Sequence, residues 1–274
     1  MSTKIFSSHI ERLLWVMSKL RDPADGCPWD LKQNFSTIVP YTIEEAYELA
    51  DAIEKGNMDD IKDELGDLLF QVVFYAQLGK EQTSFDFEAI AEHLSEKMIK
   101  RHPHVFANEH IEDDNALKAR WDEIKAAEKG HSTDDESILA NIPDGLAPIL
   151  KAEKIQKRCA KVGFDWPNAS PVFDKVREEI IEIEEELLEK ENINQQAVEE
   201  EVGDLLFAVV NLARHLNVNA ETALIKANNK FESRFRQVEG LIQKDKADIK
   251  KLTLEDLEQY WITAKTYKAA NKPL

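Results

Sequence analysis

Four acidic residues on two consecutive predicted helices have the spacing of a cation site. Glu179 and Glu182 lie three residues apart, and Glu201 and Asp204 repeat that spacing in the next apolar segment. Residues three apart share one face of a helix, and these acids border the apolar stripes that pack inward. A short connection makes the two helices antiparallel neighbours. Packing their stripes together would gather four carboxylates, whose mutual repulsion a divalent cation relieves.

The ligand type indicates which cation this would be. All-oxygen ligands suit Mg²⁺, with Mn²⁺ able to substitute, rather than zinc. A solvated acidic face is the competing interpretation, and we accept it for Glu184–Glu186 and Glu189. A di-iron four-helix protein would use Glu-x-x-His motifs. The sequence contains one such motif, Glu128 to His131, in a segment that resembles a linker.

The chain carries the same acidic pattern twice, which indicates an internal repeat. ELGDLLF (64–70) matches EVGDLLF (201–207), and EEAYE (44–48) matches EEIIE (178–182). The second set of predicted metal ligands is Glu45, Glu48, Glu64 and Asp67. Glu45 has another explanation, because it lies three residues after Thr42 and could belong to a capping box.

Basic and aromatic residues also recur in the same order in both halves. Lys230 and Arg234 are four residues apart, as are Trp261 and Lys265. Beside a bound metal such cations could hold phosphates, and the tryptophan could stack on a base. Surface cations and a core tryptophan are equally consistent, and for Lys175 an intrahelical salt bridge is as good an explanation. The first-half equivalents are Lys97, Arg101, Trp121 and Lys125.

Helices must position these residues, because 9 Gly and 9 Pro in 274 residues are too few to form the many turns of an all-β fold. We predict an all-α protein of two tandem repeats, each a bundle of four to five helices. The expected domains are residues 1–128 and 144–274, with a linker at 129–143. In the first half, we expect a helix from Thr42, after Pro40, to Gly56, and one over 85–101 that stops near Pro103. The remaining expected helices cover 7–20, the segment with Glu64 and Asp67, 115–130, 149–159, 172–191, 199–216, 220–243 and 254–270.

Charge and hydropathy exclude several classes of protein. The balance of 35 basic and 53 acidic residues gives a net charge of −18, which repels nucleic acid. The N-terminus has no signal-peptide core, and the apolar runs are too short to span a bilayer. Two cysteines form neither a metal motif nor a disulfide framework. We therefore expect a cytoplasmic protein that binds neither nucleic acid nor membrane.

Taken together, the ordered motifs resemble the MazG nucleoside triphosphate pyrophosphohydrolases of the all-α NTP pyrophosphatase group. The resemblance rests on EE-x-x-E, E-x-G-D, the downstream Lys/Arg and W-x-x-x-K, and on GCPWD (26–30), RHPHVF (101–106) and IQKRCAKVGFDW (155–166). It implies a homodimer of the two-repeat type that converts NTP and water to NMP and pyrophosphate with Mg²⁺. It also implies broad specificity and a house-cleaning role.

The resemblance further implies roles for individual residues. Glu179, Glu182, Glu201 and Asp204 would bind Mg²⁺, Lys230, Arg234 and Lys265 would hold the triphosphate, and Trp261 would line the nucleotide pocket. Lys175 is a weaker phosphate candidate. Catalysis would fall to Glu182 and Glu201, and a carboxylate such as Glu178 or Glu182 would orient the attacking water.

Both halves carry the acid set, and we favour the second as the active one. Pro103 follows Arg101 so closely that it must end the cation-bearing helix of the first half. Because four helices are few to enclose a triphosphate, we expect a dimer to complete the site. Two alternatives remain: a non-catalytic nucleotide-binding regulator on the same scaffold, and a di-iron helical-bundle protein.

Overall fold

The chain divides into two compact helical units, residues 1–132 (unit 1) and 133–274 (unit 2). The computed structural model describes residues 5–107, 137–188 and 193–270, with isolated positions at 109, 113, 116, 117, 120, 121, 123, 124 and 128. These residues contain helices and no strand, which confirms the all-α prediction. The division between units falls inside the predicted linker, 129–143. Within the described residues, no helix is both long and apolar enough to cross a membrane.

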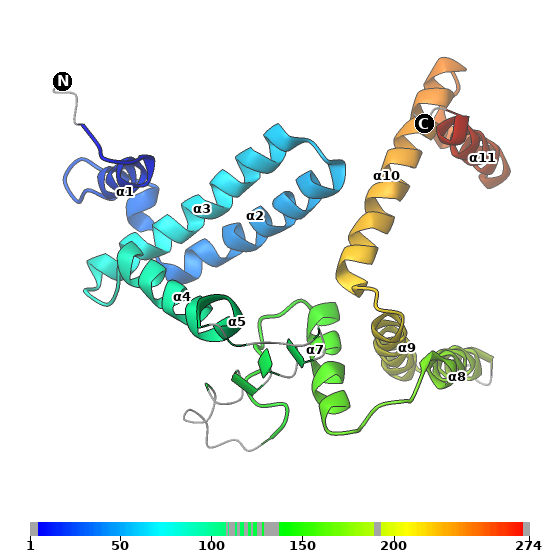
Figure 1. Cartoon of the computed structure of the whole chain (residues 1–274). Helices are drawn as coiled ribbons and strands as arrows, with labels where there is room; N and C mark the ends of the chain where they lie inside the picture. Colours follow the sequence, from blue (N-terminus) through cyan, green and yellow to red (C-terminus); the bar gives the residue numbers. More distant parts are fainter. Residues whose placement is uncertain are drawn as a thin grey trace. The chain divides into compact units, whose positions relative to one another are not determined.

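Unit 1 is organised around two long helices that pack along each other (Figure 1). Its elements are α1 (His9–Leu20), η1 (Asp30–Lys32), α2 (Phe35–Lys55), α3 (Met58–Glu81), α4 (Phe87–Arg101) and α5 (Pro103–Phe106). The chain reverses between α2 and α3 at Gly56, whose φ of 75° lies in the left-handed region that glycine tolerates best. This tight reversal makes α2 and α3 antiparallel, as the sequence predicted.

The start of α2 differs from the prediction. The helix begins at Phe35, not after Pro40, and Asn34 caps it by accepting hydrogen bonds from the Ser36 and Thr37 amides. Thr42 lies inside the helix, where its hydroxyl donates to the Ile38 carbonyl at 3.2 Å. The prediction that Thr42 is the N-cap was therefore wrong. The capping-box explanation of Glu45 is therefore wrong too, because it required Thr42 to be the N-cap.

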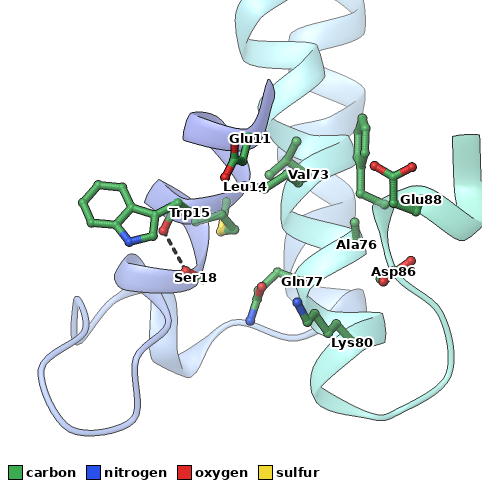
Figure 2. A pocket seen from close by; sticks show the side chains of 12 residues that line it. Glu11, Leu14, Trp15, Ser18, Val73, Ala76, Gln77, Lys80, Asp86 and Glu88 are labelled. Atoms are coloured by element: carbon green, nitrogen blue, oxygen red, sulfur yellow. Dashed lines mark hydrogen bonds between the residues drawn. The ribbon is translucent and has the colours of Figure 1, made fainter. Parts of the chain in front are cut away.

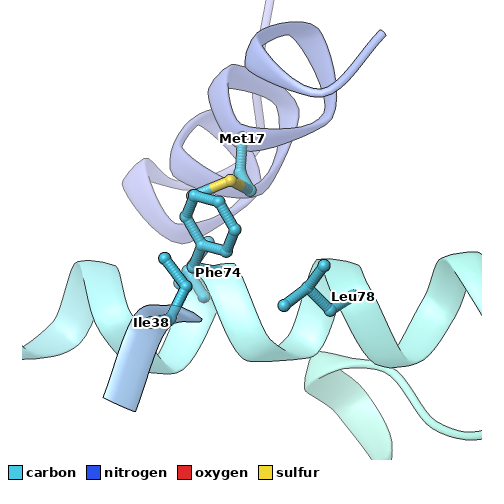
Figure 3. Packing of buried hydrophobic residues seen from close by; sticks show 5 residues of the cluster. Met17, Ile38, Phe74 and Leu78 are labelled. Atoms are coloured by element: carbon cyan, nitrogen blue, oxygen red, sulfur yellow. The ribbon is translucent and has the colours of Figure 1, made fainter. Parts of the chain in front are cut away.

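The core of unit 1 lies where α1, α2 and α3 meet. Met17, Ile38, Val73, Phe74 and Leu78 form one cluster whose members are at most 4% exposed, and Figure 3 shows Met17 against the Phe74 ring. Burying side chains of this size stabilises a fold by about 1.5–3 kcal/mol each. The three helices are thus fixed to one another through α3.

Unit 2 repeats the same order of helices. Its elements are α7 (Pro148–Lys161), α8 (Ala169–Leu188), α9 (Gln195–His215), α10 (Ala220–Lys244), η2 (Ile249–Lys251) and α11 (Leu254–Ala270). The helices α8 and α9 pack along each other, α7 lies against α9, and α10 packs on α11. The buried apolar cluster of this unit, Val238, Ile242 and Ala264, joins α10 to α11.

The last residues of the predicted linker belong to unit 2. The guanidinium of Arg158, on α7, donates to the carbonyl of Ile138 at 3.1 Å and to the carbonyl of Ala140. This ties the turn at residues 138–141 to the first helix of the unit. Residues 129–136 of the predicted linker lie outside the described residues.

Candidate functional site

The structure brings three of the four predicted acids of unit 2 together. Glu179 and Glu182 on α8 and Glu201 on α9 can place one carboxylate oxygen each within 4.8 Å of the others. The pairing of α8 with α9 produces this cluster, as the repeated spacing predicted. Asp204 lies one turn beyond Glu201 on α9, is exposed, and is not part of this group of three.

Glu179 is the buried member of the cluster, with 3% of its surface exposed. One carboxylate oxygen accepts from Lys175 at 2.7 Å, while the other, Oε2, is buried without a hydrogen-bond partner. Lys175 also bonds Glu178 at 2.8 Å, and these two carboxylates raise the pKa of the lysine. Burying a carboxylate oxygen without a partner costs free energy. A bound cation would offset this cost at Glu179.

The pKa of Glu182 and the ligand atoms of this cluster also indicate a cation site. Desolvation raises the pKa of Glu182 most, and a hydrogen bond with Glu179 and the Glu179 charge raise it further. Lys175 lowers this pKa, and the Glu201 charge adds the smallest increase. Glu178 is 55% exposed and is held by Lys175, and Glu182 is partly exposed. Water can therefore reach both carboxylates. The donor set is entirely oxygen, and histidine occurs in neither of the two acidic clusters found among the described residues. Such a set fits Mg²⁺ or Mn²⁺.

Unit 1 holds a second cluster of the same composition. Glu45 and Glu48 on α2 and Glu64 on α3 also lie within 4.8 Å of one another. Desolvation raises the pKa of Glu45, and the Asp67 charge is the next largest cause. The pKa of Glu64 is raised as well, by desolvation and by its acidic neighbours. Asp67, like Asp204, is exposed and outside the group of three.

Two predicted cations of unit 2, Arg234 and Lys265, lie beside Trp261. The Arg234 guanidinium lies 5.0 Å and the Lys265 ammonium 5.9 Å from the centre of the Trp261 ring, and Phe231 packs on the same indole at 4.9 Å. Arg234 Nε is buried without a hydrogen-bond partner. No described ion pair joins Lys230, Arg234 or Lys265 to the acids of α8 and α9. The structure thus assembles the acids and the cations as two groups on different helix pairs.

In unit 1, the predicted cation Arg101 pairs with a carboxylate instead of lying over a tryptophan ring. Arg101 is the last residue of α4, since Pro103 begins α5, and its guanidinium pairs with Glu128 at 2.6 Å. The Trp121 indole donates to the Arg101 carbonyl at 2.9 Å. Lys97 is partly exposed on α4. Lys125 lies outside the described residues.

One pocket of unit 1 lies away from its acids. A cavity of about 320 Å³ opens between α1, α3 and the start of α4, and none of the acidic ligands lines it. Figure 2 shows Trp15 and Ser18 of α1 on one side, Val73, Ala76 and Lys80 of α3 on another. Met17 of the core also lines it.

Sequence reasoning missed a polar group at the end of α9. Arg214 donates to both carboxylate oxygens of Asp165, at 2.8 and 2.5 Å, and His215 lies 2.9 Å from the same carboxylate. Mainly through the Arg214 hydrogen bonds, the pKa of Asp165 falls to about 2. Gln156 and Asn211, both 6% exposed, were missed as well. Asn211 was visible as the single amide in the apolar run LLFAVVNL, which is the signal that could have found it.

The fold and the two clusters define an all-α protein with one carboxylate site in each of two repeats. The sequence matches the MazG nucleotide pyrophosphohydrolase domain twice, over residues 33–106 and 172–239. These segments contain α2–α5, most of α8, all of α9 and most of α10, and with them both acidic clusters. The chain therefore belongs to the MazG family, a family of hydrolases.

Similar proteins of known name support this assignment. A nucleoside triphosphate pyrophosphohydrolase of Escherichia coli K12 is 51% identical over 93% of this chain and 96% of its own length. A nucleoside triphosphate pyrophosphohydrolase/pyrophosphatase MazG of Thermotoga maritima is 43% identical over 93% of this chain and 95% of its own. A Mycobacterium tuberculosis nucleoside triphosphate pyrophosphohydrolase is 35% identical over 54% of this chain and 44% of its own. The first two similarities extend across both repeats.

Proposed function

We propose that this protein is a Mg²⁺-dependent nucleoside triphosphate pyrophosphohydrolase. It cleaves the bond between the α and β phosphates with water and releases NMP and pyrophosphate. The observation that carries the proposal is the cluster of Glu179, Glu182 and Glu201, in which a buried Glu179 oxygen has no partner. The names of the two similar full-length proteins support the reaction class.

The residues of unit 2 fit the roles that this reaction requires. Glu179, Glu182 and Glu201 hold the metal, with Asp204 close by on α9. When bound, Mg²⁺ neutralises triphosphate charge and lowers the pKa of water. Glu178 and Glu182 are the carboxylates placed to accept the proton of the attacking water, whose oxygen forms the new bond to phosphorus as the bridging P–O bond breaks. Lys175 holds Glu178 and Glu179 in position.

The cations contribute binding of the triphosphate. Arg234 and Lys265 supply positive charge beside Trp261, and Arg234 still has a donor without a partner. Lys230 is exposed one turn before Arg234 on α10. In a chain of net charge −18, such a local basic group is what an anionic substrate needs. Unit 2 is the catalytic unit in this proposal, since the matching Arg101 of unit 1 is paired with Glu128.

A homodimer is part of the proposal. Large apolar side chains stay exposed on α8 and α9, and a second copy would cover them and complete the site. These side chains include Ile180, Ile181, Val202, Leu206 and Val209, which are 41–61% exposed. The proposed cellular role is that of a cytoplasmic house-cleaning enzyme with broad specificity.

Phosphorus NMR tests the proposed reaction directly. The protein is incubated with each common NTP, with Mg²⁺ and with EDTA, and the products are read by ³¹P spectra. Mg²⁺-dependent NMP and pyrophosphate are expected. NDP with phosphate would contradict the assigned bond, and binding without any turnover would favour a nucleotide-binding regulator. Iron in the purified protein with no Mg²⁺ requirement would favour the di-iron alternative.

A further inference from the structure

Glu128 of unit 1 binds the arginine that corresponds to Arg234 of unit 2. The guanidinium of Arg101 donates from Nε to both oxygens of the Glu128 carboxylate, at 3.3 and 3.1 Å, and from Nη2 to Oε2 at 2.6 Å. Both side chains are partly buried, with 24% of Arg101 and 21% of Glu128 exposed. Two neighbouring guanidinium donors on one oxyanion is also the way in which an arginine binds a phosphate group.

The same donor atom has no partner in the other repeat. Arg101 and Arg234 take the same place in the repeat, because each follows a lysine, Lys97 or Lys230, by four residues. In unit 2, Arg234 Nε is buried without a hydrogen-bond partner. Glu128 therefore satisfies in unit 1 the donor that the proposed function assigns to the triphosphate in unit 2.

Two further cations of α4 act on the same carboxylate. Lys97, Lys100 and Arg101 lie three or four residues apart, so they share one face at the end of the helix. The Arg101 hydrogen bonds lower the pKa of Glu128 most, and the charges of Arg101, Lys100 and Lys97 lower it further, against an increase from desolvation. Glu128 is thus the anion that partly neutralises the basic end of α4.

The sequence of unit 2 has the opposite charge at the position that matches Glu128. The segment from Trp121 to Glu128 aligns without a gap with the segment from Trp261 to Lys268, since each tryptophan is followed four residues later by a lysine. Glu128 therefore corresponds to Lys268. An ion pair needed by the fold of both repeats would require a carboxylate in each, so this glutamate is specific to unit 1.

Trp121 holds the segment that carries Glu128 against the end of α4. Its indole N–H donates to the main-chain carbonyl of Arg101 at 2.9 Å. Trp121 and Glu128 thus contact the same residue, one at its main chain and the other at its guanidinium. A carboxylate tethered in this way competes with a phosphate ion from solution at a high effective concentration.

We propose that Glu128 is a built-in occupant of an anion site in unit 1 and prevents phosphate compounds from binding there. The inference rests on the proposed function, because that function gives the corresponding arginine of unit 2 to the triphosphate. The ligands excluded at Arg101 are phosphate oxyanions such as pyrophosphate and polyphosphate chains. Unit 1 retains the arginine of a phosphate site and closes that site with its own side chain.

Glu128→Gln is the variant that should open this site, because it keeps the shape of the side chain and removes its charge. The probe is inorganic tripolyphosphate in metal-free buffer, so neither metal nor turnover takes part. Hydrogen exchange of the last α4 amides reports binding in unit 1, and exchange of the α10 amides reports binding in unit 2. We expect α4 protection at a tripolyphosphate concentration at least about tenfold lower than in the wild type.

Glu109→Gln is the matched control. Glu109 pairs with Arg120 at 2.9 Å in the same unit, so its substitution changes the net charge equally and leaves Glu128 in place. Protection of α4 should stay at the wild-type level in this variant. Adding Arg101→Ala to Glu128→Gln should abolish the gain. An equal gain in Glu109→Gln, or a gain that survives the loss of Arg101, would overturn the assignment, because net charge would then explain it.

A second variant and the wild type give independent tests. Glu128→Lys introduces the side chain of the matching unit 2 position and should raise the affinity beyond that of Glu128→Gln. Absence of α4 protection in a folded form of either variant would refute the proposal. The wild type needs no comparison of folding: if tripolyphosphate protects its α4 and α10 amides at the same concentration, Glu128 does not close the site.

These measurements separate the inference from the proposed function. If NTPs yield NMP and pyrophosphate but neither Glu128 variant gains α4 protection, the closed site is wrong and the enzyme assignment stands. If no NTP is hydrolysed but Glu128→Gln binds tripolyphosphate at α4, the closed site stands and the proposed reaction is wrong.

Discussion

The two repeats share an acidic cluster but differ in the residues that follow it along the central helix, α3 or α9. In unit 1, Phe74 is fully buried against Met17 in the core where α1, α2 and α3 meet. In unit 2, Asn211 occupies the same place in the repeat, and a pocket of about 520 Å³ opens between α7 and α9. The comparison indicates that the same place in the repeat holds a buried ring in unit 1 and a polar side chain that lines a pocket in unit 2.

The matching arginines of the two repeats, Arg101 and Arg234, differ in whether a carboxylate pairs with them. Arg101 ends its helix in an ion pair with Glu128, whereas Arg234 lies ten residues before the end of α10 with a buried Nε that has no partner. A guanidinium already neutralised by a carboxylate is a poorer ligand for phosphate. Unit 2 thus combines the acids with an arginine whose Nε has no partner, while the matching arginine of unit 1 is already paired.

The largest expected effect concerns the filled space in unit 1. Phe74→Ala should lower the stability of that unit by about 3–5 kcal/mol, because it empties a site that the surrounding core cannot refill. Asn211→Ala should lower the stability of unit 2 by only about 1 kcal/mol, through its lost bonds to Arg214. Hydrogen exchange of the α3 and α9 amides in urea measures both. Similar losses in the two units would contradict the contrast between core and pocket.

Catalytic asymmetry is the next largest effect. Glu201→Ala should reduce turnover on the order of 100- to 1,000-fold, because it removes a ligand of the proposed metal in the active unit. Glu64→Ala, the matched change in unit 1, should retain most of the turnover. Steady-state rates of pyrophosphate release at saturating Mg²⁺ compare the two. Equal losses would remove the functional distinction between the repeats.

The smallest effect concerns the ion pairs that tie each central helix to the loop after the first helix. The pKa of Asp165 is about 2 in the folded state, below its unfolded value of 3.8, so the pair stabilises the fold above about pH 4. Asp165→Asn should lower the free energy of unfolding by about 2 kcal/mol at pH 7. The difference should shrink as the pH falls from 4 to 2.

Urea denaturation of wild type and variant at pH 7 and pH 3 measures this pair. The matched control is Glu81→Gln in unit 1, where Arg21 lowers the pKa of Glu81 in a bond of 2.6 Å. Glu81 is 34% exposed, so solvent screens that pair and its loss should matter less. A pH-independent loss in Asp165→Asn would mean that the residue acts through packing.

Much of this architecture could be predicted from the repeated spacing of acids and apolar residues. The pairing of α8 with α9 and of α2 with α3 follows from it, and so does the convergence of Glu179, Glu182 and Glu201. The start of α2 could not be predicted in the same way. A proline inside a helix costs about 3 kcal/mol, which favours a start after Pro40. Burying Ile38 and packing Phe35 on the core offsets that cost, and these contacts are tertiary.

The pocket could not be predicted for a related reason. A glutamine on an amphipathic helix is ordinarily a surface residue, and Gln156 is buried only because α7 meets α9 beneath the loop at 163–166. Asn211 interrupts an apolar run, which indicates a buried polar group but not what it faces. Individual residue types therefore predicted the acidic cluster better than the pocket, since the cluster lies on one pair of adjacent helices.

The placement of the two apolar cores has a consequence for how the protein melts. The core of unit 1 joins α1, α2 and α3, while the described core cluster of unit 2 joins α10 and α11 and leaves α8 and α9 outside it. Segments that share few buried contacts open separately. The proposed catalytic hairpin can thus fray while most helices persist, and thermal inactivation should precede the loss of the helical circular-dichroism signal.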